Sequence, residues 1–227
     1  MNRAVIVMTK VPIAGTVKTR LQPLLPAKEC AELAAALLKD TVKKTRFVCN
    51  KTIVAFSPPG KQRELEKALK AEYIYIEQKG INLGERMFDA FRFAFESSFD
   101  SVVMIGTDSP TFPADFIELA FENLRSAEAV LGKTADGGFY LIGLRRLRKK
   151  IFENIEWSTA KTFEQTKRNI TQLNYKLQEI PAWYDVDEPG DLRRLYKEFL
   201  TDERAKHIAP ATYEWLMKQK VFSKPSD

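Results

Sequence analysis

The feature that most limits the fold of this chain is a regular alternation of short apolar runs with longer amphipathic segments. The amphipathic segments, such as residues 27–45 and 82–97, place apolar side chains at helical spacing. The short apolar runs are typical of buried strands and occupy residues 4–8, 51–56, 73–76, 102–105, 129–132, 139–144 and 175–180. Because parallel strands need helical crossovers, this order predicts a three-layer α/β/α fold with a mostly parallel sheet.

Length and composition fit one α/β domain. The chain has 227 residues, of which 44% are hydrophobic, and this is enough to fill one core. No internal repeat or long linker divides it. We therefore predict a single domain over residues 1–200, with a helical C-terminal extension of the same domain over residues 201–227.

Charge, apolar run length and cysteine content limit the kinds of partner. The net charge of +6, from 36 basic and 30 acidic residues, suits a protein that binds phosphorylated small molecules but also fits an ordinary basic surface. The basic runs are not interleaved with aromatic residues, so we expect no nucleic-acid partner. No apolar run approaches the ~18 residues of a membrane span, and we find no signal peptide. Cys30 and Cys49 form no metal-ligand pattern, and free thiols predict a cytoplasmic protein.

Residues 101–110, SVVMIGTDSP, end a predicted buried strand in polar residues. The apolar run stops at Gly106, and Asp108 stands just beyond it. Ligands of open α/β sheets bind beyond the carboxyl ends of strands, so Asp108 is a candidate ligand for a divalent cation. This segment alone is equally compatible with a second interpretation, in which Asp108 caps a helix that we expect to begin at Pro113.

The loop after the first predicted strand, residues 9–21, is basic. Gly15 permits a turn that brings backbone N–H groups close to an anion. Lys10, Lys18 and Arg20 add three cations, which predicts a phosphate-binding loop. The spacing is neither that of a Walker A loop nor a Gly-x-Gly-x-x-Gly fingerprint. The alternative is an ordinary basic surface loop.

Residues 183–192, WYDVDEPGDL, offer a second candidate metal ligand. Asp187 precedes a predicted helix and, taken alone, suits the role of its N-cap. Taken with Asp108, it supplies a second hard oxygen, and Mg²⁺ usually takes one or two protein carboxylates. Two aspartates that follow two separate predicted strands fit this need.

The segment Asp136-Gly137-Gly138 lies between two predicted strands. Paired glycines permit close approach of the backbone to a ligand, which makes Gly137 and Gly138 candidate substrate-binding residues. Asp136 is a candidate catalytic base or sugar-hydroxyl acceptor. An Asp-Gly pair also closes hairpins, so a structural role fits this segment equally well.

Six short segments, in this order, resemble those of one known family. The segments are KTRL at 18–21, NLGERM at 82–87, GTDSP at 106–110, DGGFYLIGL at 136–144, IEWST at 155–159 and DVDEPGDL at 185–192. They resemble the DUF2064 family, also described as radical-SAM/selenodomain-associated transferase 1, of the nucleotide-diphospho-sugar transferase superfamily. The resemblance runs over nearly the whole chain and implies a GT-A-like sheet.

The resemblance also implies roles for the candidate residues. The basic loop and the DVDEPGDL segment are similar to those of molybdenum-cofactor and phospholactate nucleotidyltransferases. In that wider group the loop binds nucleotide phosphates and the residues matching Asp108 and Asp187 bind the metal. The chain departs from these relatives in two ways. Many of the nucleotidyltransferases have a glycine-rich first loop, whereas this loop has only Gly15. Many GT-A glycosyltransferases have an Asp-x-Asp motif after the central strand, which this chain lacks.

Together these observations predict a transferase that depends on Mg²⁺ (or Mn²⁺) and uses a nucleotide-activated donor. Asp108 and Asp136 are its candidate catalytic residues. The family label favours a glycosyltransferase with a nucleotide sugar. The alternative is a nucleotidyltransferase that releases pyrophosphate from a nucleoside triphosphate, which the basic loop favours. A non-catalytic nucleotide-binding module is the second alternative. The acceptor and the oligomeric state are not specified by the sequence.

Overall fold

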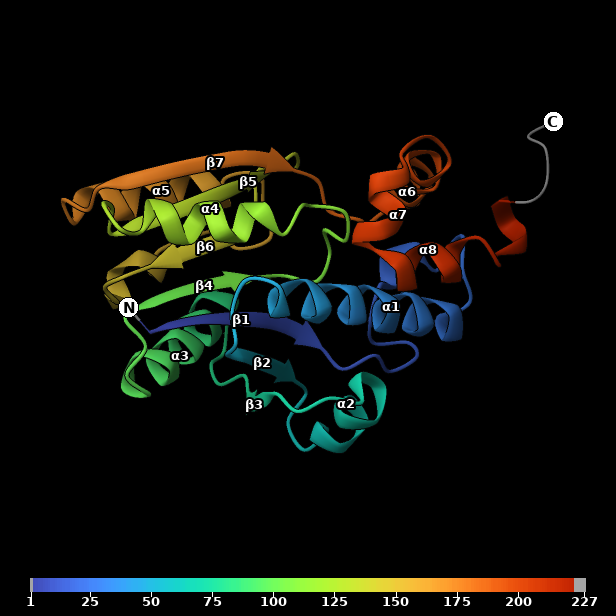
Figure 1. The fold of residues 1–227 in the computed structure, drawn as a ribbon, viewed down its shortest axis with the longest axis horizontal. Helices are drawn as coiled ribbons and strands as arrows, with labels where there is room; N and C mark the ends of the chain where they lie inside the picture. The colour runs from blue at the N-terminus through green and yellow to red at the C-terminus, as the bar shows by residue number, and fades with distance from the viewer. Residues whose placement is uncertain (1, 223–227) are drawn as a thin grey trace.

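The computed structural model describes residues 2–222 (Figure 1). Its strands and helices alternate along most of the chain, as the sequence predicts. The elements are β1 Arg3–Lys10, η1 Thr19–Leu21, α1 Ala27–Arg46, β2 Thr52–Ser57, α2 Gln62–Leu69, β3 Ile74–Glu77, α3 Leu83–Glu96, β4 Ser101–Ile105, α4 Asp115–Asn123, β5 Ala129–Thr134, β6 Phe139–Leu144, η2 Lys149–Phe152, α5 Thr162–Gln172, β7 Leu177–Trp183, α6 Pro189–Thr201, α7 Glu203–Ile208, α8 Pro210–Leu216 and η3 Lys220–Phe222.

The strands form one sheet of seven, in the order β3-β2-β1-β4-β6-β5-β7. Strand β6 runs antiparallel to both of its neighbours, and the other pairs are parallel. The prediction of a three-layer α/β/α fold with a mostly parallel sheet is therefore confirmed. The carboxyl ends of β1 and β4, which are adjacent, lie side by side at one edge of the sheet (Figure 1).

Helices cover both faces of the sheet, because each carries one apolar stripe that must be buried. One face packs against α1 and α4, through side chains such as Leu38 and Ile117. The other packs against α3 and α5, through Phe91 and Phe163. The central strands are apolar on both sides, as expected for a sheet that is covered twice.

The C-terminal helices α6, α7 and α8 pack against the first half of α1 (Figure 1). Their shared core includes Leu33 and Leu37 of α1 together with Leu195 and Leu216. Asp40, buried in α1, accepts hydrogen bonds from the backbone N–H groups of residues 211 and 212 at the start of α8. These contacts place the C-terminal helices beside the carboxyl edge of the sheet.

Several predicted boundaries are wrong by a few residues. Helix α4 begins at Asp115, two residues after Pro113, and the Pro113 carbonyl accepts from Phe116 N in the turn that leads into the helix. The helix expected directly after Trp157 begins only at Thr162, since Ser158 adopts a left-handed conformation with φ of 62°. Strand β7 ends at Trp183, three residues later than expected. Among residues 2–222, no helix has the length and hydropathy needed to cross a membrane.

Candidate active site

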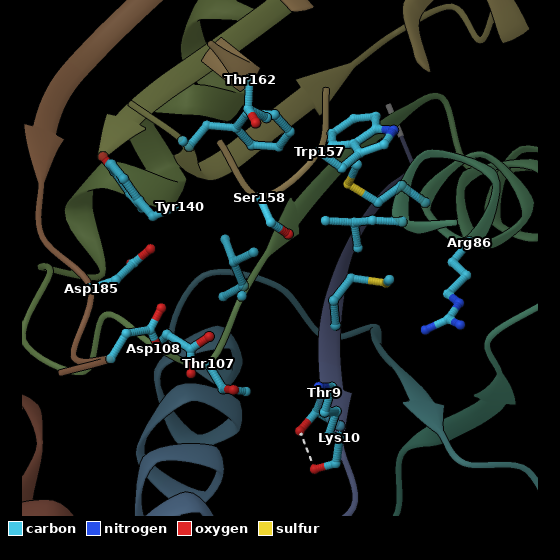
Figure 2. Close-up of a pocket in the computed structure, with 18 of the residues that line it drawn as sticks. Thr9, Lys10, Arg86, Thr107, Asp108, Tyr140, Trp157, Ser158, Thr162 and Asp185 are labelled. Atoms are coloured by element: carbon cyan, nitrogen blue, oxygen red, sulfur yellow. Dashed lines mark hydrogen bonds between the residues drawn. The ribbon is translucent and has the colours of Figure 1, made fainter. Parts of the chain in front are cut away.

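A cavity of about 500 Å³ opens at the carboxyl edge of the sheet (Figure 2). Asp108, Asp185 and Tyr140 lie on one side of it, and Trp157 and Arg86 lie on the other. The cavity forms where the turn after β4 meets the segment after β7, close to the basic loop after β1. This is the edge at which the sequence predicts a ligand site.

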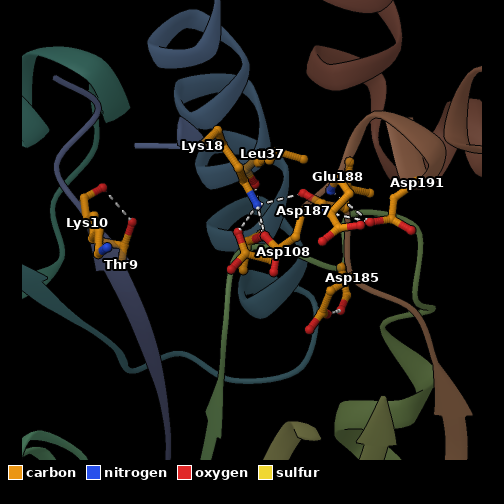
Figure 3. A network of polar contacts seen from close by, with 12 residues as sticks. Thr9, Lys10, Lys18, Leu37, Asp108, Asp185, Asp187, Glu188 and Asp191 are labelled. Carbon is orange, nitrogen blue, oxygen red and sulfur yellow. Dashed lines mark hydrogen bonds and ion pairs between the residues drawn. The ribbon is translucent and has the colours of Figure 1, made fainter. Parts of the chain in front are cut away.

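The side chain of Lys18 joins the two candidate metal ligands (Figure 3). Its ammonium pairs with Asp108, and it donates to Asp187 Oδ1 at 2.9 Å and to the Val186 carbonyl at 2.8 Å. The side chain is only 7% exposed. Burial lowers the pKa of this ammonium, but the charges and hydrogen bonds of the two carboxylates outweigh burial, so its pKa is raised. Lys18 is therefore a fixed positive charge between two aspartates.

Backbone and side-chain contacts bring the two aspartates together. Val186 N donates to the Asp108 carbonyl at 2.8 Å, and the Ser109 hydroxyl donates to Asp185. These bonds tie the turn after β4 to the segment after β7, although the two lie far apart in the sequence. Asp108 and Asp187 consequently face the same cation from two different segments.

The interpretation of both aspartates as helix caps is wrong. Helix α4 has Ala114 at its N-cap position, with no side-chain cap, and Asp108 contacts Lys18 instead. The N-cap of α6 is Glu188, which forms a capping box with Asp191. The side chains of Asp108 and Asp187 therefore do not cap these helices.

The donor set around Lys18 fits a hard divalent cation. The oxygens that surround its ammonium are two carboxylates and one carbonyl, which are ligands of the kind that Mg²⁺ and Mn²⁺ take. Lys18 itself is a stand-in cation at this position. Within residues 2–222, no group of three or more His, Cys, Asp or Glu side chains is arranged as a complete metal site. Water and a ligand phosphate would have to complete the coordination.

Asp185 is a third carboxylate in the cavity, and sequence reasoning missed it. Burial raises its pKa to about 7, and the negative charges of its aspartate neighbours act in the same direction. A signal was present, because Asp185 and Asp187 flank Val186, which is fully buried. Because successive side chains of an extended segment point to opposite sides, the two carboxylates are expected to lie on the same side.

The other predicted residues divide into those that line the cavity and those that do not. Lys10 and Arg20 line it, but within residues 2–222 neither forms a hydrogen bond or ion pair with Asp108 or Asp187 (Figure 3 shows Lys10 apart from them). Arg20 is exposed and lies 3.9 Å from Glu188. Gly15 is not part of the cavity lining, and its φ of 83° shows that it serves the turn of the basic loop.

Residues 136–138 form the hairpin turn between β5 and β6, so the structural interpretation of this segment holds. Asp136 Oδ1 accepts from Thr134 Oγ1 and from Gly138 N. Asp136 and Gly138 also line the cavity, whereas Gly137 does not. Gly137 has φ of 91°, and a side chain there would collide with the backbone of Ala160. Its role in the turn therefore explains this glycine without any ligand.

The wall opposite the carboxylates contains residues to which the sequence assigned no role. Trp157 packs over Gly84, where an added Cβ would lie 2.7 Å from the indole ring. Ser158 points into the cavity (Figure 2). Trp157 and Ser158 lie in the segment 155–159, and Gly84 lies in the segment 82–87; both segments carry the family resemblance, which was the available signal.

Solved structures share this fold. A protein from Desulfovibrio desulfuricans G20, provisionally named a nucleotide-diphospho-sugar transferase, matches with a TM-score of 0.91 at 26% identity, over 100% of both chains. Rv0371c from Mycobacterium tuberculosis H37Rv, solved in complex with manganese, matches with a TM-score of 0.53 at 16% identity, over 87% of this chain and 99% of that chain. The second likeness shows the fold alone.

A curated relative carries a defined activity. The 2-phospho-L-lactate guanylyltransferase of Methanocaldococcus jannaschii is 26% identical over 201 residues, which cover 86% of this chain and 85% of the relative. Together with the fold and the cavity, these relatives define the class: the protein is a transferase related to nucleotide-diphospho-sugar transferases and nucleotidyltransferases. The non-catalytic alternative is set aside on the same basis.

The chain belongs to the DUF2064 family, which is described as an uncharacterized protein conserved in bacteria. The family model matches residues 38–159. This match spans α3, the Asp108 turn, the β5–β6 hairpin and Trp157, so most of the cavity lies within it. The expected family resemblance is thus confirmed.

Proposed function

We propose that this protein is a nucleotidyltransferase that uses a nucleoside triphosphate and releases pyrophosphate. The observation that carries this proposal is the joining of Asp108 and Asp187 by Lys18, beside Lys10 at the end of β1 and Arg20 of the basic loop. Two carboxylates suit one divalent cation, and the loop cations suit the remaining charge of a triphosphate. The guanylyltransferase relative supports this choice over the alternatives.

In this proposal, Asp108 and Asp187 hold Mg²⁺ or Mn²⁺, and the manganese complex of Rv0371c supports such use of metal in this fold. A cation bound there supplies charge neutralisation to the donor phosphates. A cation bound between the two carboxylates would displace the Lys18 ammonium, which together with Arg20 would then stabilise the negative charge that grows on the leaving pyrophosphate. The acceptor oxygen attacks the α-phosphorus, the bond from this phosphorus to the bridging oxygen breaks, and pyrophosphate leaves.

We assign to Asp136 the role of taking the proton of the acceptor hydroxyl. Asp136 lines the cavity, and its Oδ1 accepts the hydrogen bonds from Thr134 Oγ1 and Gly138 N. A carboxylate that is fixed in this way suits general-base work. This role for Asp136 joins that of the two metal ligands in the proposal.

Glycosyl transfer from a nucleotide sugar is the second candidate. The name given to the Desulfovibrio structure, with its TM-score of 0.91, is the observation in its favour. The same carboxylates would then serve the diphosphate of the donor. The absence of an Asp-x-Asp motif in the Asp108 turn favours the first candidate.

Thermal unfolding in the presence of Mg²⁺ tests the choice between the two donors. A ligand that binds only the folded state adds about 2.7 kcal/mol to the free energy of unfolding at 100 times its Kd, and this raises Tm. We expect a nucleoside triphosphate to raise Tm, and a chelator to remove the effect. Stabilisation by nucleotide sugars alone would overturn nucleotidyl transfer in favour of glycosyl transfer, and no response to either class would contradict both.

A further inference from the structure

Lys44 is a buried lysine to which the proposed chemistry gives no role. It lies in the last turn of α1, and only 3% of the residue is exposed. Taking an amine out of water costs free energy, and replacing a buried charged group by an apolar one of similar volume is often neutral or stabilising. Packing alone therefore gives no reason for a lysine at this position.

The contacts of Lys44 lead to the turn after β4. Its Nζ donates to the Pro110 carbonyl at 2.9 Å and lies 3.6 Å from the centre of the Phe112 ring. The nearby carboxylate of Asp40 binds the start of α8 through residues 211 and 212. Lys44 thus holds the backbone of one specific turn and is not half of a hydrogen-bonded ion pair.

That turn carries Asp108. Besides the ion pair of Asp108 with Lys18, two contacts to the turn come from the segment after β7: Val186 N donates to the Asp108 carbonyl, and Asp185 accepts from Ser109. Lys44 adds the anchor from α1, on Pro110, two residues beyond the carboxylate. With both anchors in place, the turn is fixed from two independent elements.

We propose that Lys44 is a positioning residue, which holds the Pro110 carbonyl so that the Asp108 carboxylate stays in place for its metal ion. This inference rests on the proposed function, since it needs Asp108 to be a metal ligand. Residues behind metal ligands act in this way, and their loss typically costs about 10- to 100-fold in metal affinity or activity.

The test measures Mn²⁺ affinity by electron paramagnetic resonance, and Tm, in four variants and the wild type. Lys44→Met keeps the unbranched stem, one atom shorter, but removes the donor, and Lys44→Arg keeps a donor but adds bulk. Lys43→Met is the matched control, because Lys43 is the exposed neighbour on the same helix. Asp108→Asn reports on the metal ligand itself.

We expect Lys44→Met to bind Mn²⁺ about 10-fold more weakly while its Tm stays level or rises. Lys44→Arg should bind Mn²⁺ more tightly than Lys44→Met despite a lower Tm, and Lys43→Met should match the wild type. If Mn²⁺ affinity is unchanged in Lys44→Met, or simply follows Tm across the variants, the positioning role is wrong. If Asp108→Asn also binds Mn²⁺ like the wild type, the proposed metal site itself fails.

Discussion

Lys18 shows what single residues contribute to this site and how far they could be predicted. The sequence indicated a phosphate-binding role for it, and strand-end reasoning singled out Asp108 and Asp187. The pairing among the three was out of reach, because the two aspartates lie 90 and 169 residues from Lys18 along the chain. Lys44 was missed for a different reason. It lies seven residues after Leu37 on the buried face of α1, where the helical pattern predicts an apolar residue.

At this scale we predict that Lys18→Met has opposite effects on the two ligands of the site. Its ammonium occupies the position between the carboxylates that a divalent cation would take. Removing it should therefore tighten Mn²⁺ binding in the absence of nucleotide, and weaken the affinity for a triphosphate. Calorimetric titration of each ligand checks both directions.

Lys10→Met is the control for a simple loss of positive charge, since Lys10 lines the cavity without touching either aspartate. Its effect on Mn²⁺ affinity should be several-fold smaller than that of Lys18→Met. Equal effects in the two variants would mean that Lys18 does not compete for the site.

At the scale of elements, the spacing of apolar residues was sufficient to predict the strands and the main helices. It predicted the first and last residues of these elements less well. Helix α6 illustrates this, because its N-terminus was assigned to Asp187 but lies one residue later. Glu188 and Asp191 form the capping box, and Asp191 Oδ2 accepts from the backbone of both Asp187 and Glu188. The candidate metal ligand is thereby freed for the cavity, and its backbone is held by the cap.

We predict that Asp191→Ala lowers the free energy of unfolding by about 1 kcal/mol, since it removes this cap. For a chain of this length the corresponding fall in Tm is about 2–4 °C. Scanning calorimetry measures it, with Glu214→Ala at an exposed position of α8 as the control. A Tm for Asp191→Ala equal to that of the control would show that the cap carries no stability.

At the scale of the whole molecule, the alternation of strands and helices predicted the layers and the mostly parallel sheet. It did not predict the strand order, which places β6 between β4 and β5 and brings the β5–β6 turn into the cavity. Local pattern contains no information on which strands become neighbours across the sheet. The site is consequently a product of topology, because its residues come from segments spread over most of the chain.

The dependence of stability on pH should report on buried Lys44. Burial lowers its pKa from the usual 10.5 to about 7, with Asp40 on the preceding turn acting in the opposite sense. Between these two values the unfolded chain binds a proton that the folded protein lacks, so this group makes the free energy of unfolding rise with pH. The slope is on the order of 1 kcal/mol per pH unit within that window.

Lys44→Met removes this contribution. The difference in Tm between Lys44→Met and the wild type should therefore favour the variant most near pH 7, and this advantage should fall as the pH approaches 9.5. Lys43→Met, measured alongside, should show no such trend. A difference between Lys44→Met and the wild type that is constant over this range would mean that Lys44 keeps an ordinary pKa in the folded protein.

The central claim, that Asp108 and Asp187 together hold the metal ion of a nucleotide-dependent transferase, is tested most directly by Mn²⁺ titration of the wild type, Asp108→Asn and Asp187→Asn. The titration is followed by electron paramagnetic resonance, with and without the triphosphate that raises Tm most. We predict that the nucleotide tightens Mn²⁺ binding in the wild type, and that each substitution weakens it at least about 10-fold. Asp115→Asn, at an exposed position of α4, should match the wild type. Wild-type Mn²⁺ affinity in both Asp108→Asn and Asp187→Asn would contradict the account.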